Sequence, residues 1–340
     1  MTPMTRTFTC AVVAALAAGR IGAFAAGQSA ANPVSAHVAA ARSAAGQDHL
    51  AVFDLLCTAP APAPPAAPTR PAAAPPPAPP DRSQWHREPV KVFDNLYFVG
   101  QSEFSAWAVT TSAGIILFDT IFDYSVEDEV VNGLKTLGLD PAQIKYAIVS
   151  HGHGDHSGGA KYLQDHFGTR VVLSAADWDL LDHSTGTMPK RDMVATDGQA
   201  LTLGNTTLRM YLTPGHTLGT ISTLIPVTDG GRPHMVAEWG GTMFNWTRNR
   251  AAYITPERPD SFWFRTYSES AKRFRGIAAA AGADVLISNH TIYDGSKTKL
   301  PALANRKPGS PHPYVIGADA VQRFLTMVDE CAQAGLERTR

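Results

Sequence analysis

The chain has 340 residues, of which 44% are hydrophobic, and its 29 lysines and arginines against 30 acidic residues give a formal net charge of −1. This length and apolar content suffice for a sizeable core in one large domain or two smaller ones, which excludes intrinsic disorder for most of the chain. A balanced charge without a basic stripe argues against nucleic-acid binding, and the short basic run at 272–275 is interpreted as the solvated face of a helix.

Residues 1–25 have the features of an export signal peptide. Arg6 precedes the apolar stretch 8–19, and the small residues at 23–25 suit a signal peptidase. Cleavage near Ala25 would give a periplasmic or secreted protein. The alternative is an uncleaved anchor, but Arg20 interrupts the run before it reaches the roughly twenty apolar residues that a membrane span needs. No stable membrane anchor is therefore expected.

Two segments separate this signal from the main domain. Residues 26–57 are predicted to contain a short helical segment, because apolar side chains recur there among alanines. Residues 58–82 are almost entirely alanine and proline, a composition that cannot bury a core, and are predicted to be a linker. In an oxidising compartment Cys57 and Cys331 could pair, or both could remain free, because the sequence does not give their proximity.

Residues 83–340 are predicted to form one catalytic domain of the mixed α/β class, with helices on the outside. Apolar and β-branched runs bounded by Gly, Asp or Ser indicate strands, and longer periodic stretches indicate helices. The predicted strands are residues 91–100, 105–111, 115–119, 146–150, 170–174, 194–203, 206–213, 220–226, 234–238 and 284–288, and the predicted helices are 125–137, 158–167, 260–281 and 317–334.

The most informative motif is His-Gly-His-Gly-Asp-His at 151–156, directly after a predicted strand. Imidazole and carboxylate are the zinc ligands of catalytic sites, and the interspersed glycines let a tight loop aim its neighbours at one centre. A solvated polar turn is the alternative, but it does not account for this density. His216 and His290 each follow an apolar run. Either one alone would be read as an ordinary loop residue, whereas beside this motif both are candidate ligands.

The motif, followed by Gly215-His216-Thr217 and the late His290, resembles the metallo-β-lactamase superfamily over about residues 88–335. The resemblance implies a four-layer αβ/βα sandwich, with helices outside two mixed sheets and two zinc ions per chain at one end. It also implies that one zinc is held by His151, His153 and His216, and the other by Asp155, His156 and His290.

The segment Gly240-Gly241-Thr242 indicates a branch of this superfamily. Many of its hydrolases carry a Gly-Asp-Thr-Leu-Phe segment whose aspartate bridges the metals, and the subclass 1 and 2 lactamases place a cysteine ligand in this region. Neither feature is present here. A second site built from Asp155, His156 and His290 is similar to the third subclass of class B β-lactamases, although that subclass often has serine where Gly241 or Thr242 stands.

The resemblance implies a zinc-dependent hydrolase that opens the β-lactam ring by attack of a metal-bound hydroxide on the amide carbonyl, an activity of the antibiotic-resistance type. Zinc lowers the pKa of its bound water from about 15.7 to about 7, so no protein nucleophile is required. Asp155 would orient that hydroxide as the catalytic residue. Asp119, at a strand end, could hydrogen-bond a ligand imidazole from behind or simply cap the strand.

The candidate substrate contacts are Thr242, Asn245 and Trp246, and the expected substrate is a small β-lactam. Four other aromatic residues, Phe104, Trp107, Trp178 and Phe244, are candidates for a substrate groove, although core packing is the ordinary role of such side chains. Two alternative functions remain. One is an exported dizinc hydrolase of the same fold that acts on a lactone or another ester or amide, and the other is a non-catalytic zinc-binding module. The oligomeric state is not predicted.

Overall fold

The computed structural model describes residues 32–58, 78–307 and 309–340. The predicted export signal at 1–25 and most of the predicted linker at 58–82 lie outside these ranges, so both remain predictions. Among the helices that the structure describes, none combines the length and the apolar character that a membrane crossing requires.

Seven strands form the first sheet, in the order in which they follow along the chain. The pairings from β1 to β4 are antiparallel and those from β4 to β7 are parallel. Both faces are buried, because Ile116 and Phe118 of β4 pack in one hydrophobic cluster and Ile115 and Leu117 in another. The strands are β1 (Val90–Lys91), β2 (Leu96–Phe98), β3 (Trp107–Thr111), β4 (Gly114–Phe118), β5 (Ile144–Ile148), β6 (Arg170–Ser174) and β7 (Met193–Ala195).

A second sheet has five strands in the order β12-β11-β10-β9-β8. Its pairings are antiparallel except for β11 with β12, which run parallel because helix α8 connects them. The strands are β8 (Ala200–Leu203), β9 (Thr206–Leu212), β10 (Ile221–Asp229), β11 (Arg232–Trp239) and β12 (Val285–Ser288).

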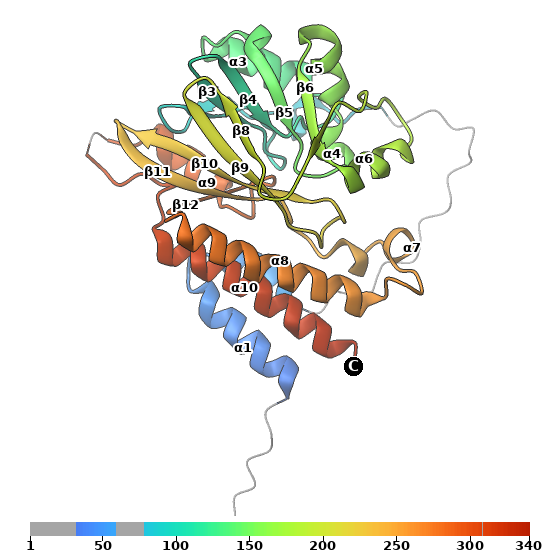
Figure 1. Ribbon diagram of the computed structural model, residues 1–340. Coiled ribbons are helices and arrows are strands. Elements are labelled where there is room, and N and C mark those ends of the chain that lie inside the picture. Colours follow the sequence, from blue (N-terminus) through green and yellow to red (C-terminus); the bar gives the residue numbers. More distant parts are fainter. Residues whose placement is uncertain (1–31, 59–77, 308) are drawn as a thin grey trace, which may run out of the picture. The chain divides into compact units, whose positions relative to one another are not determined.

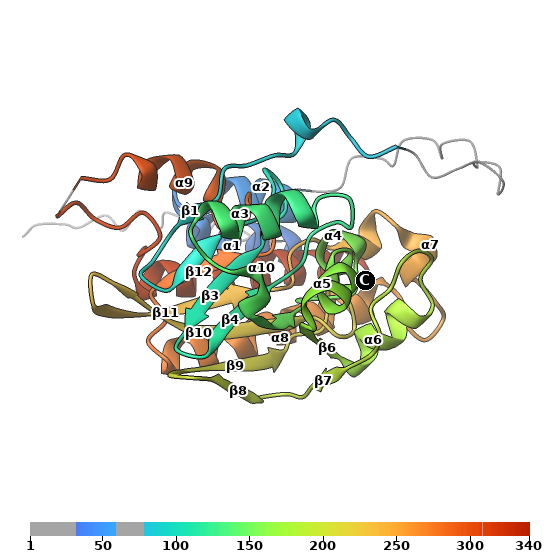
Figure 2. The same ribbon diagram turned by 90° about the horizontal axis from the view of Figure 1, so that it is seen from above.

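The two sheets lie face to face, with α3 and α5 outside the first and α8 and α10 outside the second (Figure 1). Side chains of both sheets fill the space between them, among them Phe118 and Ile148 from the first and Met210 and Ile225 from the second. Seen from above, α4, α6 and α7 gather at one end of the sheets (Figure 2). This four-layer arrangement confirms the predicted αβ/βα fold.

Local signals mark two of the helix ends in the main domain. Ser174 caps the start of α6 by accepting a hydrogen bond from the Asp177 backbone N–H, and Gly168 ends α5 in the left-handed conformation. The helices are η1 (Arg82–Gln84), the π-helical turn η2 (Glu127–Val131), α3 (Asn132–Thr136), η3 (Pro141–Gln143), α4 (Gly154–Ser157), α5 (Ala160–Phe167), α6 (Ala175–Asp182), η4 (Asn245–Thr247), α7 (Arg250–Tyr253), α8 (Asp260–Ala280), α9 (Ser296–Ala304) and α10 (Ala318–Arg338).

The N-terminal segment forms two helices where one helical segment was predicted. We call α1 (Pro33–Ala45) and α2 (Leu50–Cys57) the N-terminal hairpin; Gly46, with a φ of 55°, ends its first helix. Both helices pack against α10. A disulfide between Cys57 and Cys331 joins α2 to α10, so of the two possibilities that the sequence left open, the paired one is present.

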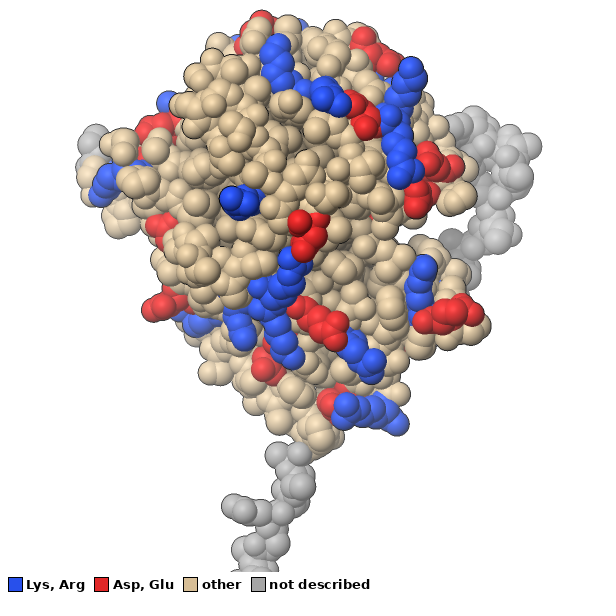
Figure 3. Space-filling view, in the orientation of Figure 1, with Lys and Arg blue, Asp and Glu red and all other residues tan. Residues whose placement is uncertain are grey.

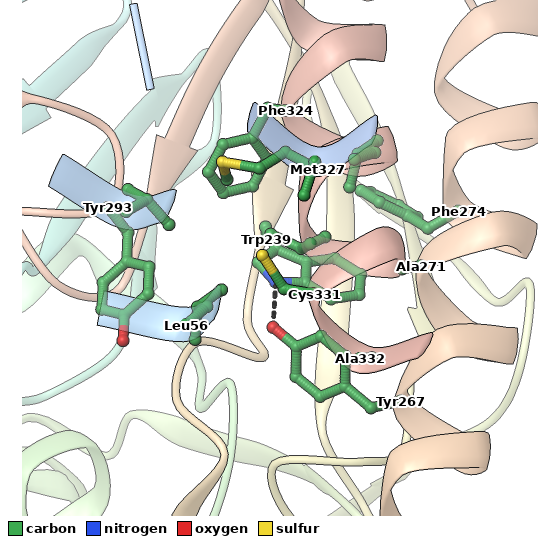
Figure 4. Packing of buried hydrophobic residues seen from close by; sticks show 14 of the residues in the cluster. Leu56, Trp239, Tyr267, Ala271, Phe274, Tyr293, Phe324, Met327, Cys331 and Ala332 are labelled. Carbon is green, nitrogen blue, oxygen red and sulfur yellow. Dashed lines mark hydrogen bonds between the residues drawn. The ribbon is translucent and has the colours of Figure 1, made fainter. Parts of the chain in front are cut away.

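This disulfide lies inside the hydrophobic cluster between the second sheet and its helices (Figure 4). Leu56 of the hairpin, Phe324 of α10 and Trp239 of β11 belong to the same cluster, and the Trp239 indole donates to the hydroxyl of Tyr267 on α8 at 3.3 Å. The hairpin is therefore part of the core of the described residues.

Two predicted strands are wrong in their extent. Residues 194–203 were expected as one strand, but β7 pairs with the first sheet and β8 with the second, because the turn at 196–199 carries the chain from one sheet to the other. Residues 91–100 likewise divide into β1 and β2, which pair with each other. Helices α4, α6, α7 and α9 were not predicted; α6 follows β6 directly, because its cap Ser174 is also the last residue of that strand.

Charged side chains of both signs are interspersed over the visible face of the molecule (Figure 3). The basic run of α8 is largely paired, because Arg273 lies 2.6 Å from Asp197 and Lys272 lies 3.6 Å from Asp329. This pairing agrees with a solvated helix face and provides no stripe for phosphates.

Candidate metal centre

Three loops that follow strands bring the candidate ligands to one edge of the sheets. The loop after β5 and the short helix α4 that follows it carry residues 151–156, the loop after β9 carries His216, and the loop after β12 carries His290. Gly215 fits the second of these loops because its φ is 147° and a Cβ there would lie 2.8 Å from Tyr267. Both sheets therefore contribute side chains to the centre.

The first ligand group consists of His151, His153 and His216. The Nε2 atom of His216 lies 3.1 Å from Nε2 of His151 and 3.2 Å from Nδ1 of His153. Zinc–nitrogen bonds of about 2.0–2.1 Å in a tetrahedron place neighbouring donor atoms about 3.3 Å apart. The spacing of the three nitrogens therefore fits one zinc ion.

The second group consists of Asp155, His156 and His290. Nε2 of His156 lies 3.1 Å from Nε2 of His290 and 3.3 Å from Oδ2 of Asp155, and the same oxygen is 3.7 Å from His290. The two groups adjoin, because the rings of His151 and His156 are 4.2 Å apart. His151, Asp155 and His156 also satisfy the geometry of a metal-binding triad by themselves.

Hydrogen bonds on the outer side of three rings direct their inner nitrogens toward the centre. Nδ1 of His216 donates to the Met243 carbonyl at 2.8 Å, and Nδ1 of His156 donates to the Asp119 carboxylate at 2.8 Å. Nε2 of His153 lies 2.9 Å from the Tyr253 hydroxyl, which leaves Nδ1 to face the other ligands. In a neutral ring the second nitrogen then carries a lone pair, the form that binds a metal.

Asp119 hydrogen-bonds the candidate ligand His156 from the side away from the centre, which is one of its two predicted roles. Its carboxylate accepts from the Ser150 backbone N–H at 2.6 Å and from the Ser150 hydroxyl at 2.9 Å, in addition to His156. The residue is 2% exposed and has a φ of 57°, a left-handed conformation that few residues other than glycine adopt. The position of this carboxylate therefore requires an unfavourable backbone conformation at Asp119.

Asp177 connects two ligand loops and was missed by the sequence analysis. Its carboxylate accepts from the Gly152 N–H at 2.9 Å, from the Thr217 hydroxyl at 2.7 Å and from the Gly219 N–H at 3.0 Å. Burial raises its pKa to about 6, although these hydrogen bonds oppose the rise. The signal was weak, because Asp177 lies in the first turn of α6, a helix that the sequence did not predict.

The protonation states follow from burial and from the crowding of the rings. Burial, together with neighbouring imidazoles, moves the pKa of His151 and His216 well below the usual value, and lowers the pKa of His153 to about 4 and of His290 to about 3. These four rings are therefore neutral at pH 7.

Asp155 and His156, in contrast to these four neutral rings, are both charged at pH 7 in the metal-free protein. Burial opposes the charged form of His156, but the carboxylates of Asp155 and Asp119 outweigh it and raise the pKa of this ring to about 10. Burial likewise opposes ionisation of Asp155, yet His156 and the other imidazoles lower its pKa. In the absence of a cation, one proton thus stays on His156 between two carboxylates.

The donor set fits zinc. Imidazole nitrogens and a carboxylate are its usual catalytic ligands, and the described cysteines are joined to each other in the disulfide. His151, His156 and His216 are buried, whereas His153, Asp155 and His290 are partly exposed. One side of the centre is therefore accessible to water and to a small molecule.

The structure separates the three candidate substrate contacts. Asn245 lies at the centre, with Nδ2 3.3 Å from Nε2 of His216 and 3.4 Å from the Tyr253 hydroxyl. Thr242 is buried, and among the described residues its hydroxyl has no hydrogen-bond partner. Trp246 is wrong as a substrate contact, because its side chain is 0% exposed and packs between Trp263 and Phe264 in the core.

Of the four other aromatic candidates, three are buried in the core and one lies beside the centre. Trp107, Trp178 and Phe244 are buried, which is the ordinary core role. Phe104 is only partly buried, and its ring lies 5.1 Å from that of His290. Tyr253, which contacts His153, was missed because a lone tyrosine in a short helix carries no sequence signal.

Comparison with known proteins identifies the architecture. Residues 104–229 match the family model of the metallo-beta-lactamase superfamily. Among solved structures, the chain is similar to BJP-1, a subclass B3 metallo-beta-lactamase of Bradyrhizobium japonicum, with 26% identity and a TM-score of 0.57 over 70% of this chain and 89% of that one.

Curated relatives match over shorter stretches. A hydroxyacylglutathione hydrolase of Acidiphilium cryptum is 34% identical over 82 residues, which are 24% of this chain and 31% of that protein. An N-acyl homoserine lactonase of a Bacillus species is 30% identical over 110 residues, 31% of this chain and 42% of that protein. The chain thus spans less than half the length of these two relatives.

Proposed function

Because this chain has the metallo-β-lactamase fold, as its resemblance to that superfamily predicted, we propose that it is an exported zinc-dependent hydrolase that opens the β-lactam ring of small-molecule substrates. The proposal assigns it to the subclass 3 type, with two zinc ions per chain. The observation that carries it is the composition of the centre: five imidazoles and the carboxylate of Asp155, with no carboxylate from the end of β11.

Directly after β11, Gly240 corresponds to the glycine that precedes the bridging aspartate of other hydrolases, and it has no room for a side chain. A Cβ on Gly240 would lie 1.9 Å from the carbonyl oxygen of Ile221, so only glycine fits there. Gly241 and Thr242 follow and carry no carboxylate. The second ion would therefore rely on Asp155, His156 and His290.

The comparisons support the same choice. In structure, the subclass B3 enzyme BJP-1 aligns with this chain over 89% of its own length at 26% identity. The similarity to the lactamases includes the second half of the fold, which provides His290 and the loop after β11.

Zinc, when bound, supplies an activated water and an electrophile for the carbonyl oxygen. The chain's own residues position the water and the substrate. Asp155 is the carboxylate within the centre and can accept a hydrogen bond from a water held there. Asn245 offers an amide N–H and Tyr253 a hydroxyl at the accessible side, and both suit a substrate carbonyl or carboxylate oxygen.

The first test is hydrolysis of a chromogenic cephalosporin and of a carbapenem by the purified protein, with and without a zinc chelator. We expect chelator-sensitive turnover with kcat/KM of about 10⁴ M⁻¹s⁻¹ or more, within the ordinary enzymatic range. Turnover that a chelator does not abolish would contradict the proposal.

A second candidate function is hydrolysis of a lactone or thioester, which the local similarity to the lactonase and the hydroxyacylglutathione hydrolase favours. The same preparation should therefore be offered an N-acyl homoserine lactone and a glutathione thioester. Faster turnover of either one than of both lactams would replace the lactamase assignment. Zinc binding without turnover of any of these compounds would support a non-catalytic module.

A further inference from the structure

Three partly buried aromatic rings form a continuous row beside the metal centre. We call Phe104, Phe122 and Tyr124 the aromatic ledge. The ring of Phe122 lies edge-on to Phe104 at 5.0 Å and stacks on Tyr124 at 5.0 Å with an interplanar angle of 17°. Each ring retains some exposure, unlike the fully buried aromatics of the core.

The aromatic ledge begins at the second ligand group. The Phe104 ring lies 5.1 Å from the ring of His290 and 6.4 Å from that of His156. The backbones of Phe104 and His290 also pair in an isolated antiparallel bridge. The row of rings therefore starts beside the metal centre, where a substrate would react, and extends outward from it.

The far end of the ledge is fixed by residues before β1. Trp85 is 8% exposed and packs edge-on against Tyr124 at 5.7 Å. Its carbonyl accepts from the Ser102 N–H at 2.8 Å, and the next residue, His86, contacts the buried carboxylate of Glu129 at 2.5 Å. The rings are thus preorganised, which reduces the entropy lost when a ligand binds.

We propose that the aromatic ledge binds an aromatic substituent of the substrate. The ledge would then favour substrates that carry an aromatic group next to the bond that is cleaved. The proposal rests on the proposed function, since it assumes that a substrate reacts at the metal centre. Aromatic pairs prefer centroid separations of 4.5–7 Å, and a fourth ring could continue the row. Asp123, exposed between two ledge residues, disfavours an acidic substituent.

The test uses a pair of zinc-binding thiols, 2-phenylethanethiol and ethanethiol, which differ only in the aromatic ring. Their affinities for the zinc-loaded protein are measured by calorimetry, so that the readout does not require turnover. We expect the phenyl compound to bind about tenfold more tightly, the size expected for a well-packed aromatic contact.

Phe122→Ala and Tyr124→Ala should each lose most of this preference while ethanethiol binding stays unchanged. The matched control is Phe167→Ala, because this partly buried ring ends α5 just before β6 begins, at the sheet edge opposite the ligand loops. Equal affinities of the two thiols for the wild-type protein, or a preference that both ledge variants retain, would overturn the proposal.

Turnover of benzylpenicillin and of 6-aminopenicillanic acid by the same preparations separates this proposal from the proposed function. An aromatic thiol preference that depends on the ledge, without turnover of either lactam, refutes the lactam assignment and supports the ledge. Lactam turnover without that thiol preference refutes the ledge alone.

Discussion

At the scale of single residues, the carboxylate of Asp119 organises the second ligand group. A non-glycine residue in the left-handed region costs about 1–3 kcal/mol. Here the three hydrogen bonds from Ser150 and His156 offset that cost. The result is a ring whose inner nitrogen faces Asp155 and His290.

We expect Asp119→Asn to lower the affinity for the second zinc by about 10- to 100-fold, because the outer partners of metal ligands typically contribute this much. Competitive titration with a chromophoric chelator measures the two affinities separately. His290→Ala should abolish the second site and leave the first. Asp123→Asn, an exposed change in the same loop, is the control, and equal second-site affinities of Asp119→Asn and Asp123→Asn would refute this role.

The two zinc affinities should depend differently on pH. His156, with its pKa raised to about 10 in the metal-free protein, must lose a proton to bind zinc, so the affinity of the second site should rise by up to about tenfold per unit between pH 6 and pH 8. The rings of the first site are already neutral in this range, and its affinity should change much less. Zinc titrations at pH 6, 7 and 8 decide this, and parallel curves for both sites would contradict it.

At the scale of elements, the strand ends decide which side chains reach the centre. The end of β11 passes so close to β10 that Gly240 has no space for a side chain, whereas a Cβ on Gly241 would come no closer than 3.5 Å to its neighbours. The backbones of β10 and β11 are thus in close contact next to the ligand loops.

We expect Gly240→Ala to lower the free energy of unfolding by about 1–3 kcal/mol or more, the typical cost of overpacking a rigid contact. Gly241→Ala, one residue away, should change it by less than about 1 kcal/mol. Urea denaturation of both variants measures the difference. Similar stabilities would show that the backbone near Ile221 can move.

The N-terminal hairpin is the second element with a measurable contribution. Its disulfide links residues 274 apart in sequence. Replacing Cys57 and Cys331 by serine should therefore cost about 2–5 kcal/mol of stability. Reductant should destabilise the wild-type protein to the level of the double variant and leave the variant unaffected. Free thiols at Cys57 and Cys331 in wild-type protein unfolded without reductant would show that the bond is absent in solution.

At the scale of the whole molecule, the metal centre joins the two sheets, because ligands follow β5 of one and β9 and β12 of the other. We expect zinc at about 1,000 times its Kd to stabilise the chelator-stripped protein by about 4 kcal/mol, by preferential binding to the folded state. Thermal unfolding measures this shift. Calcium, which prefers oxygen ligands, is the control, and a shift of the same size with calcium would indicate a nonspecific ionic effect.

The sequence by itself determined the fold class and the candidate ligands, because the crowding of His and Asp at 151–156 is local and rare, and because apolar runs before His216 and His290 mark strand ends. It could not determine which distant side chains support those ligands. Asp177 and Tyr253 reach the centre only because α6 and α7 fold back to it, and Trp246, adjacent to Asn245, points into the core instead.

The tertiary structure alone also decided the pairing of Cys57 with Cys331 and the row of rings beside His290. Such contacts depend on the distance between segments far apart in the chain, and no local pattern of residues encodes that distance.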